Sequence, residues 1–159
     1  MFWCTRLISA GKPFKFCAKK EWNGDFTNLG AEDTGFTVAD NNCTVAETGV
    51  YTIVVDIKGA KITIAKAEVF GIGDAFGSWD AGKYPFTINE DGTATITTAA
   101  AGNLRMYTAV PGVDWWQAEY NIYDGKIQYR GEGGDQAAVS VAANATVTVN
   151  FNAGTGEIK

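Results

Sequence analysis

The sequence contains no histidine, and its three cysteines form no metal-binding motif. Without an imidazole the chain cannot assemble Ser-His-Asp or Cys-His nucleophilic centres, and most zinc sites are excluded as well. Cys4, Cys17 and Cys43 cannot all pair within one chain, and none of them lies in a Cys-x-x-Cys spacing. We interpret them as small packing residues, and we expect neither a metal site nor a cofactor.

Basic clusters and long apolar runs are also missing. The 13 Lys and Arg residues are dispersed along a chain whose formal net charge is −5. This distribution argues against nucleic acid or an anionic membrane surface as a partner, because both attract basic patches. No apolar run approaches the roughly 20 residues that span a bilayer. No charged and then apolar leader follows Met1, so we expect either an intracellular protein or a segment upstream of Met1.

Period-two alternation of apolar and polar residues recurs along the chain, whereas helical periodicity is hard to find. In residues 51–57 every second side chain is aromatic or aliphatic, from Tyr51 to Ile57. Residues 146–151 alternate in the same way. Together with an ordinary apolar fraction of 46%, this pattern predicts a folded all-β protein.

An internal repeat organises these strands. Residues 51–57 and 146–151 superpose with an offset of 94, and residues 22–26 and 116–120 share the pattern W-[NQ]-x-[DE]-[FY] at that offset. Before the tryptophan the offset falls to 90, so the second copy has four extra residues in the loop before Trp116. A period near 90 residues is too long for a solenoid unit and fits one small β-sandwich per copy.

The second copy includes elements for which the first has no counterpart. Residues 69–72 read as a strand, a loop with Trp79 follows, and an Asp-Gly turn at residues 91–92 joins the strands of a hairpin. Counted back by the offset, Met1 falls inside the second strand of that hairpin. We therefore predict two tandem antiparallel β-sandwich modules, an N-terminally truncated one over residues 1–66 and a complete one over residues 67–159.

A truncated sandwich would expose a sheet edge and part of its apolar inner face. We expect a second copy of the chain in a homodimer, an exchanged strand, or the second module to cover this surface. The link between the copies, near residues 65–67, has no Pro/Ser-rich spacer, which predicts limited hinge freedom.

Aromatic residues make up 13% of the chain, and four of its five tryptophans lie in or beside loops rich in Gly, Asp and Asn. An exposed indole offers a flat platform for the C–H face of a sugar, while polar neighbours bond the hydroxyls at the sugar's edge. The alternative is that each tryptophan packs over its own loop. Similar polar residues recur at matching positions in both copies, which favours binding. The carbohydrate site predicted for the second copy consists of Trp79, Trp116, Trp115, Arg105, Gln117, Asp135 and Gln136. A weaker site in the first copy consists of Lys15, Trp22, Asn23, Asn41 and Asn42.

Several short motifs resemble one protein family. They are residues 69–74 (VFGIGD) with residues 77–80 (GSWD), residues 11–16 (GKPFKF), and the repeat endings at residues 49–56 and 146–150. With these motifs the whole chain resembles the SusE/SusF family, the starch-binding outer-membrane lipoproteins of Bacteroidetes starch-utilisation systems.

The resemblance implies tandem immunoglobulin-like β-sandwich modules that bind α-glucan at the cell surface, beside other components of an outer-membrane glycan-uptake system. In this family a site pairs two tryptophans about forty residues apart with a basic and an amide side chain. Trp79 and Trp116 (or Trp115) fit that spacing, Arg105 fits the basic position, and Asp135 or Gln136 fits the amide. The lipoprotein signal and anchor of the family are not seen in this sequence.

Three classes of function are weighed. The first is non-catalytic binding of a polysaccharide, most readily an α-glucan such as starch. The second is a structural or protein-interaction β-sandwich that binds no glycan. Exposure of both Trp79 and Trp116 would favour the first class, and burial of both would favour the second. The third is a glycan-active enzyme that uses two carboxylates, and it is rejected because the chain is too small for a long catalytic cleft. Its candidate residues are Asp74, Asp80, Glu119 and Asp135.

Overall fold

The computed structural model describes residues 1–22 and 24–159, and it confirms the all-β prediction. Among the described residues the one helical element is a 3₁₀ turn, η1 (Asp74–Phe76). The chain divides into two compact units, unit 1 (Met1–Lys66) and unit 2 (Ala67–Lys159). That they are a truncated module and a complete carbohydrate-binding module stays a prediction. In the described part of the chain, no helix is long and apolar enough to cross a membrane.

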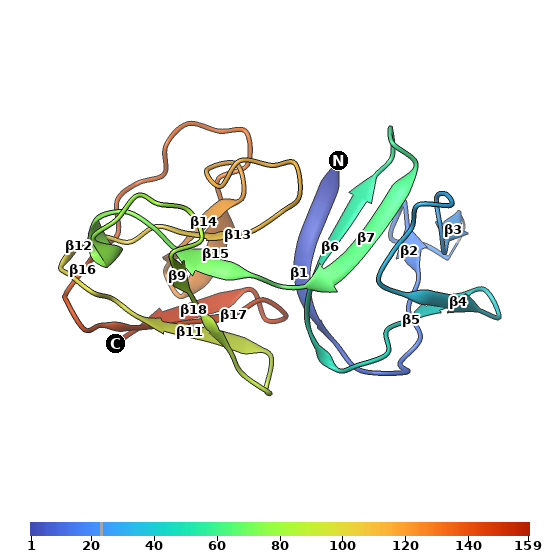
Figure 1. Cartoon of the computed structure of the whole chain (residues 1–159), viewed down its shortest axis with the longest axis horizontal. Coiled ribbons are helices and arrows are strands. Elements are labelled where there is room, and N and C mark those ends of the chain that lie inside the picture. The colour runs from blue at the N-terminus through green and yellow to red at the C-terminus, as the bar shows by residue number, and fades with distance from the viewer. Residues whose placement is uncertain (23) are drawn as a thin grey trace. The chain divides into compact units, whose positions relative to one another are not determined.

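Unit 1 contains a three-stranded antiparallel sheet of order β1-β6-β7 and two short ribbons, β2-β3 and β4-β5 (Figure 1). Its strands are β1 (Phe2–Ile8), β2 (Phe16–Cys17), β3 (Asp25–Phe26), β4 (Thr37–Ala39), β5 (Asn42–Thr44), β6 (Gly49–Asp56) and β7 (Lys61–Lys66). The buried centre of its core is formed by Val45, Tyr51, Ile53, Ile62 and Ile64. Partly buried phenylalanines from the β2-β3 ribbon and its flanking loops pack against this centre.

Unit 2 contains a nine-stranded sheet of order β10-β11-β17-β18-β15-β14-β13-β8-β9 and a two-stranded ribbon, β12-β16. Its strands are β8 (Val69–Gly71), β9 (Tyr84–Pro85), β10 (Thr87–Ile88), β11 (Thr93–Thr97), β12 (Gly102–Asn103), β13 (Met106–Thr108), β14 (Glu119–Tyr123), β15 (Lys126–Tyr129), β16 (Ser140–Val141), β17 (Thr146–Asn150) and β18 (Thr155–Ile158). The ring of Tyr120 on β14 meets that of Phe151, just after β17, edge to face at 5.7 Å. Strands from distant parts of the sheet therefore share one core.

Strand pairing repeats between the units with the spacings read from the sequence. Phe16 faces Phe26 in unit 1, and Met106 faces Tyr120 in unit 2, which reproduces the offsets of 90 and 94. The hairpins β6-β7 and β17-β18 also match at an offset of 94, since both have a residue with positive φ at the equivalent turn position. These residues are Ala60 (φ 49°) and Gly154 (φ 69°).

The strand predicted over residues 51–57 differs in two respects from the expectation. β6 ends at Asp56, and Ile57 lies exposed in the turn that follows. Val50 and Val54, on the face opposite Tyr51, are buried as well. A strand buried on both faces shows only weak alternation, because apolar residues are favoured at every position.

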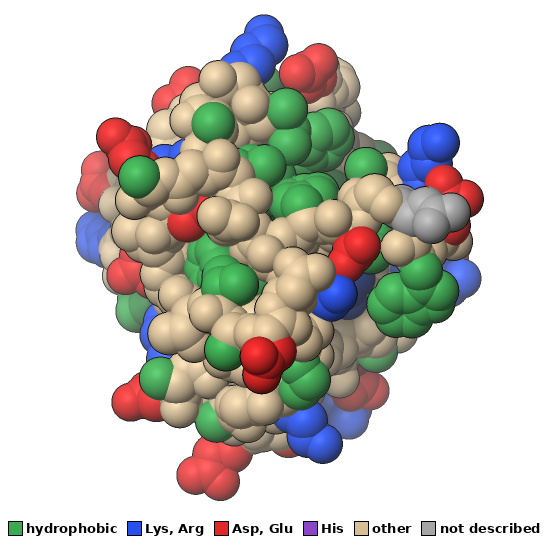
Figure 2. Space-filling view, turned by 90° about the vertical axis from the view of Figure 1, so that its right-hand side faces the viewer, with side chains coloured by type: hydrophobic (Ala, Val, Ile, Leu, Met, Phe, Trp, Pro, Cys, Tyr) green, Lys and Arg blue, Asp and Glu red, His purple; other side chains and the backbone are tan. Residues whose placement is uncertain are grey.

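The units differ at their sheet edges. In unit 2, β11 lies between β10 and β17, and β13 lies between β8 and β14. In unit 1 the equivalent strands, β1 and β2, each pair on one side only within the described residues. Hydrophobic side chains are open to solvent on the face of unit 1 shown in Figure 2. A cavity of about 350 Å³ in this unit is lined by Phe2, Phe16, Cys17, Ala18, Phe26, Val55 and Ile57.

Candidate functional site

Trp79 lies in the tight loop after β8 and η1. Gly73 has a φ of 88°, and its amide donates a hydrogen bond to the Ser78 carbonyl at 2.7 Å. A Cβ at Gly73 would lie 3.3 Å from the indole of Trp79. The sequence therefore needs glycine here, both for the backbone angle and for the close approach of the ring. One side of the indole packs on this backbone, and 56% of the residue stays exposed.

Trp115 and Trp116 lie in the turn between β13 and β14. The amide of Gln117 donates to the Asp114 carbonyl at 3.0 Å, and the Gln117 side-chain oxygen accepts from the Asp114 amide at 3.2 Å. Gln117 therefore stabilises the turn itself. The turn gives the two tryptophans different surroundings, since Trp115 is half-buried and Trp116 is 37% exposed.

A row of three aromatic rings, those of Trp115, Tyr107 and Phe70, continues from Trp79. The ring centroid of Trp115 lies 6.2 Å from that of Trp79 and 6.1 Å from that of Tyr107. Tyr107 stacks on Phe70 at 5.4 Å, and its hydroxyl accepts a hydrogen bond from the Gly82 amide at 2.7 Å. Trp115 is thus placed as a support for Trp79 more than as a platform of its own.

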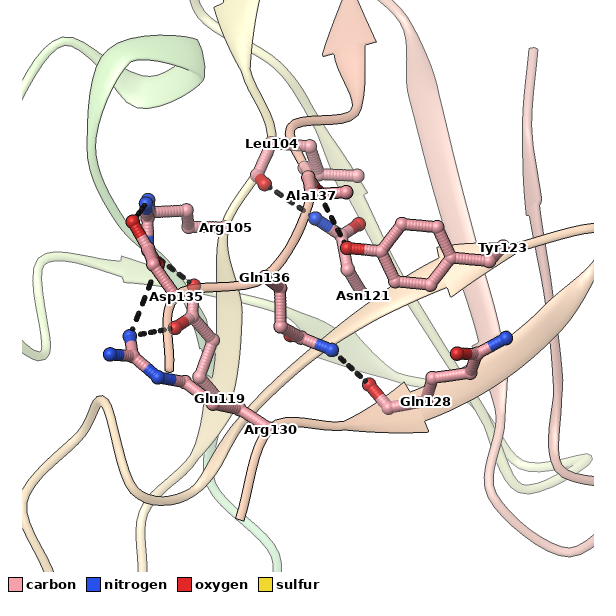
Figure 3. A network of polar contacts seen from close by, with 10 residues as sticks. All are labelled: Leu104, Arg105, Glu119, Asn121, Tyr123, Gln128, Arg130, Asp135, Gln136 and Ala137. Carbon is pink, nitrogen blue, oxygen red and sulfur yellow. Dashed lines mark hydrogen bonds and ion pairs between the residues drawn. The ribbon is translucent and has the colours of Figure 1, made fainter. Parts of the chain in front are cut away.

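Two arginines and two carboxylates form an ion-pair network (Figure 3). The two oxygens of Glu119 accept hydrogen bonds from Nη1 of Arg105 and Nη1 of Arg130, each at 2.8 Å. Asp135 accepts two bonds from Arg105, at 2.8 and 2.7 Å, and one from Arg130 at 3.2 Å. Figure 3 shows both guanidinium groups turned toward these carboxylates. With two positive and two negative charges, the network is neutral as a whole.

Each arginine of the network lies over one exposed tryptophan. The guanidinium carbon of Arg105 is 5.7 Å from the ring centroid of Trp79, and that of Arg130 is 5.2 Å from the ring centroid of Trp116. Cations at such distances are attracted to the negative face of an indole. The site therefore combines two flat apolar rings with N–H donors beside them.

The network favours the charged forms of Asp135 and Arg105. The hydrogen bonds from Arg105 hold the pKa of Asp135 below its ordinary value of 3.8. The bonds to Asp135 in turn raise the pKa of Arg105. Both groups are therefore charged at neutral pH, and the donors of Arg105 are always protonated.

The structure brings most of the predicted site residues of unit 2 together and adds one. Arg105 contacts both the carboxylate of Asp135 and the ring of Trp79. Gln136 instead donates from Nε2 to the Gln128 carbonyl at 2.9 Å, across to β15 (Figure 3). Arg130 was missed by the sequence analysis. Its counterpart at an offset of 94 is Phe36, so no repeated basic position marked it.

The residues predicted for the weaker site in unit 1 are only partly assembled. Lys15 donates to Asp25 at 2.8 Å, a pair that matches Arg105 and Glu119 by the offsets of 90 and 94. Trp22 is 86% exposed. It lines an open groove of about 560 Å³ together with Cys17, Ala18, Lys19, Lys20 and Glu21.

The asparagines predicted for unit 1 are engaged in local contacts. Asn41 accepts a long hydrogen bond from the Thr27 hydroxyl at 3.5 Å, and Asn42 donates to the Asp40 carbonyl at 2.9 Å. The other predicted amide, Asn23, lies outside the described residues. Because both described asparagines are engaged in these contacts, we regard this set as the less complete one.

The four candidate carboxylates are held in ion pairs with arginine or lie in an exposed loop. Glu119 is 2% exposed and holds two arginines, while Asp74 and Asp80 lie exposed in the loop that includes Trp79. Within residues 1–22 and 24–159, no group of three or more Cys, Asp or Glu residues is arranged to hold a metal ion.

The chain is similar to known proteins over nearly all of its length. The family described as SusF/SusE starch specific CBMs (carbohydrate-binding modules) matches residues 68–157. Outer membrane protein SusF of Bacteroides thetaiotaomicron is 32% identical over 176 aligned residues, which cover 99% of this chain and 36% of that protein. The crystal structure of SusF from the same organism matches with a TM-score of 0.84 at 30% identity, over 99% of this chain and 40% of that one. This chain therefore belongs to the SusF/SusE family of starch-specific carbohydrate-binding modules, which bind and do not catalyse.

Proposed function

We propose that unit 2 binds an α-glucan such as starch through Trp79 and Trp116, with Arg105 and Arg130 as hydrogen-bond donors beside the rings. The observation that supports this most is the exposure of the two indoles, 56% and 37%, each with a guanidinium over its ring. Two buried rings would instead have favoured a structural module. Family membership supports the same class of ligand.

Sugar chemistry explains why this arrangement suits a glucan. A glucose ring has an apolar C–H face that covers an indole, and hydroxyls around its edge that accept hydrogen bonds from arginine. Trp115 would act as the support of Trp79, and Gln117 as the support of the turn that presents Trp116. Asp135 and Gln136 complete the proposed wall of the site, with Asp135 orienting Arg105.

The expected affinity is modest. Covering roughly 100 Å² of one indole face contributes about 2–3 kcal/mol at about 25 cal/mol per Å². Two platforms contribute about 5 kcal/mol before entropy losses, which corresponds to millimolar or somewhat tighter dissociation constants. Such modules bind polymers well when several act together. We propose Lys15, Trp22, Asn23, Asn41 and Asn42 of unit 1 as a second, weaker contact.

Localisation and partners are also proposed. The chain spans about a third of the curated relative it matches, and that relative is named an outer membrane protein. We infer that the protein to which this chain corresponds lies at the cell surface as an outer-membrane lipoprotein, together with other components of a glycan-uptake system.

We also propose where the two modules begin and end, and what covers the exposed apolar surface of unit 1. Residues 1–66 would be a truncated and residues 67–159 a complete immunoglobulin-like sandwich. The single-sided pairing of β1 and β2 and the apolar cavity beside them support a homodimer or an exchanged strand that covers unit 1.

A titration tests the proposed ligand. Malto-oligosaccharides and, as a comparison, cello-oligosaccharides are added to the chain while tryptophan fluorescence is recorded, for the wild type and for Trp116→Ala. We expect a saturable change with malto-oligosaccharides that Trp116→Ala strongly weakens. Trp22→Ala serves as the matched control and should leave most of the response. If no glycan changes the emission even at high concentration, the proposed function is wrong.

A further inference from the structure

Glu119 is the most deeply buried charged side chain beside the site. It lies on β14 with 2% of its side chain exposed, and each of its oxygens accepts one hydrogen bond at 2.8 Å. The donors are Arg105 and Arg130. A carboxylate at this depth is stable only because both of its oxygens are paired with cations.

The two arginines extend this contact outward to the two exposed rings. Arg105 lies over Trp79, and Arg130 lies over Trp116. One carboxylate therefore sits between two arginine–tryptophan pairs. We propose that Glu119 is a positioning residue that holds both arginines, and through them both tryptophans, in the arrangement needed for glycan binding.

The geometry of arginine explains how one buried group can act on two rings. A guanidinium is planar and donates in fixed directions, so a bond at one nitrogen sets the orientation of the whole group. Arg130 uses Nη1 for Glu119 and also for Asp135, and its buried Nε has no partner within the described chain. Nη2 is then the nitrogen that remains for a ligand beside Trp116.

Asp135 alone is a poor substitute for Glu119. Its side chain is 59% exposed, and its contact with Arg130 is longer, at 3.2 Å. Exposed ion pairs contribute little, because water screens them and both side chains lose freedom. Without Glu119, two guanidinium groups would share one exposed carboxylate and repel each other.

Unit 1 provides an internal control for this inference. Asp25 occupies the position equivalent to Glu119, but within the described residues its ion pair is with Lys15 alone. An ammonium group is a compact point charge with no planar fork. The same carboxylate position therefore holds one cation in unit 1 and two in unit 2.

The test compares three carboxylate variants, Glu119→Gln, Asp135→Asn and Asp25→Asn. The indole N–H signals of ¹⁵N-labelled chain are assigned with Trp→Phe variants and recorded without ligand. Affinity for maltoheptaose is then measured by calorimetry. For Glu119→Gln we expect shifts in the signals of both Trp79 and Trp116 and an affinity lower by roughly tenfold, as for loss of a hydrogen bond to a charged group. Asp135→Asn should have a smaller effect on the two signals and on the affinity, and Asp25→Asn should leave the Trp79 and Trp116 signals in place.

Several results would overturn the proposal: unchanged Trp79 and Trp116 signals in Glu119→Gln, a change at only one of them, or an effect of Asp135→Asn as large as that of Glu119→Gln. The inference rests on the proposed glycan binding, but the NMR comparison needs no ligand. A wild type that binds no glycan would therefore refute the function while the signals still decide the role of Glu119. If Glu119→Gln does not fold, Arg130→Met replaces it. It should move the Trp116 signal and leave that of Trp79 in place, and any other pattern contradicts the proposal.

Discussion

The two units build the same ion pair at equivalent positions but surround it differently. In unit 1 Lys15 pairs with Asp25 without a further ion-pair partner among the described residues, and 26% and 23% of the two side chains are exposed. In unit 2 Arg105 and Glu119 are 19% and 2% exposed, and Arg130 and Asp135 join them. The difference shows that the same charge pair can be joined by further charged partners and lie beside aromatic rings in one unit, while it lacks those neighbours among the described residues of the other.

A second difference lies in the core. Met106 and Tyr120 of unit 2 are fully buried, whereas the equivalent Phe16 and Phe26 of unit 1 are only partly buried. The reason is that β8 pairs with β13 in unit 2, while β2 pairs only with β3 in the described part of unit 1. A flanking strand therefore both buries the core and brings the Trp79 loop to the site.

The largest expected effect on glycan binding separates the two units. Trp79→Ala removes one platform of unit 2 and should weaken malto-oligosaccharide binding by roughly 30- to 150-fold, from about 2–3 kcal/mol of lost contact. Trp22→Ala in unit 1 should weaken it by less than about threefold, because the unit 2 site stays intact. Calorimetric titration of both variants with a malto-oligosaccharide measures the two losses of affinity. Equal losses would show that the units bind alike.

Core substitutions should distinguish the units in stability. Tyr120→Ala removes a fully buried ring and should lower the free energy of unfolding by about 3–5 kcal/mol. Phe26→Ala, at the equivalent position, should cost about half as much, because solvent already reaches its ring. Urea unfolding followed by circular dichroism and by tryptophan emission gives both values. A larger loss for Phe26→Ala would mean that its ring is covered in solution.

The proposed cover of unit 1 predicts a defined oligomeric state. Phe2 is 69% exposed and lines the apolar cavity of unit 1, so a homodimer or exchanged strand should bury it. Light scattering after size exclusion should then give the mass of two chains for the wild type and of one chain for Phe2→Asp. A wild-type monomer would refute this cover.

The smallest expected effect is a pH dependence shared by the units. Hydrogen bonding to Arg105 lowers the pKa of Asp135, and hydrogen bonding to Lys15 lowers that of Asp25. A lowered folded-state pKa stabilises the fold above the unfolded value near 3.8, and the stabilisation disappears as pH falls through the lowered pKa. NMR titration of the carboxyl groups should show both values below 3.8. Arg105→Met should raise only the pKa of Asp135 toward 3.8, and Lys15→Met should raise only the pKa of Asp25 toward 3.8.

Much of the candidate site could be anticipated from the sequence. The repeat located Arg105 and Trp116 because each has a chemically similar partner in the first copy, Lys15 and Trp22. Arg130 could not be found in this way, since Phe36 stands at the matching position. The different surroundings of Trp115 and Trp116 could not be predicted either, because neighbouring tryptophans in a turn look alike in the sequence. In the structure Trp115 packs beside Tyr107, whereas Trp116 is exposed.

The sequence by itself determined the all-β class, the duplication with its offsets, and the loops that hold the tryptophans. These follow from local rules, since alternation, turn residues and repeated patterns act over a few residues. Only the tertiary structure decided which side chains meet. The union of Arg105, Glu119, Arg130 and Asp135 joins three strands or their ends and a distant loop. Such long-range contacts depend on how strands pair and on which carboxylate is buried. Neither can be predicted from a short segment of the sequence.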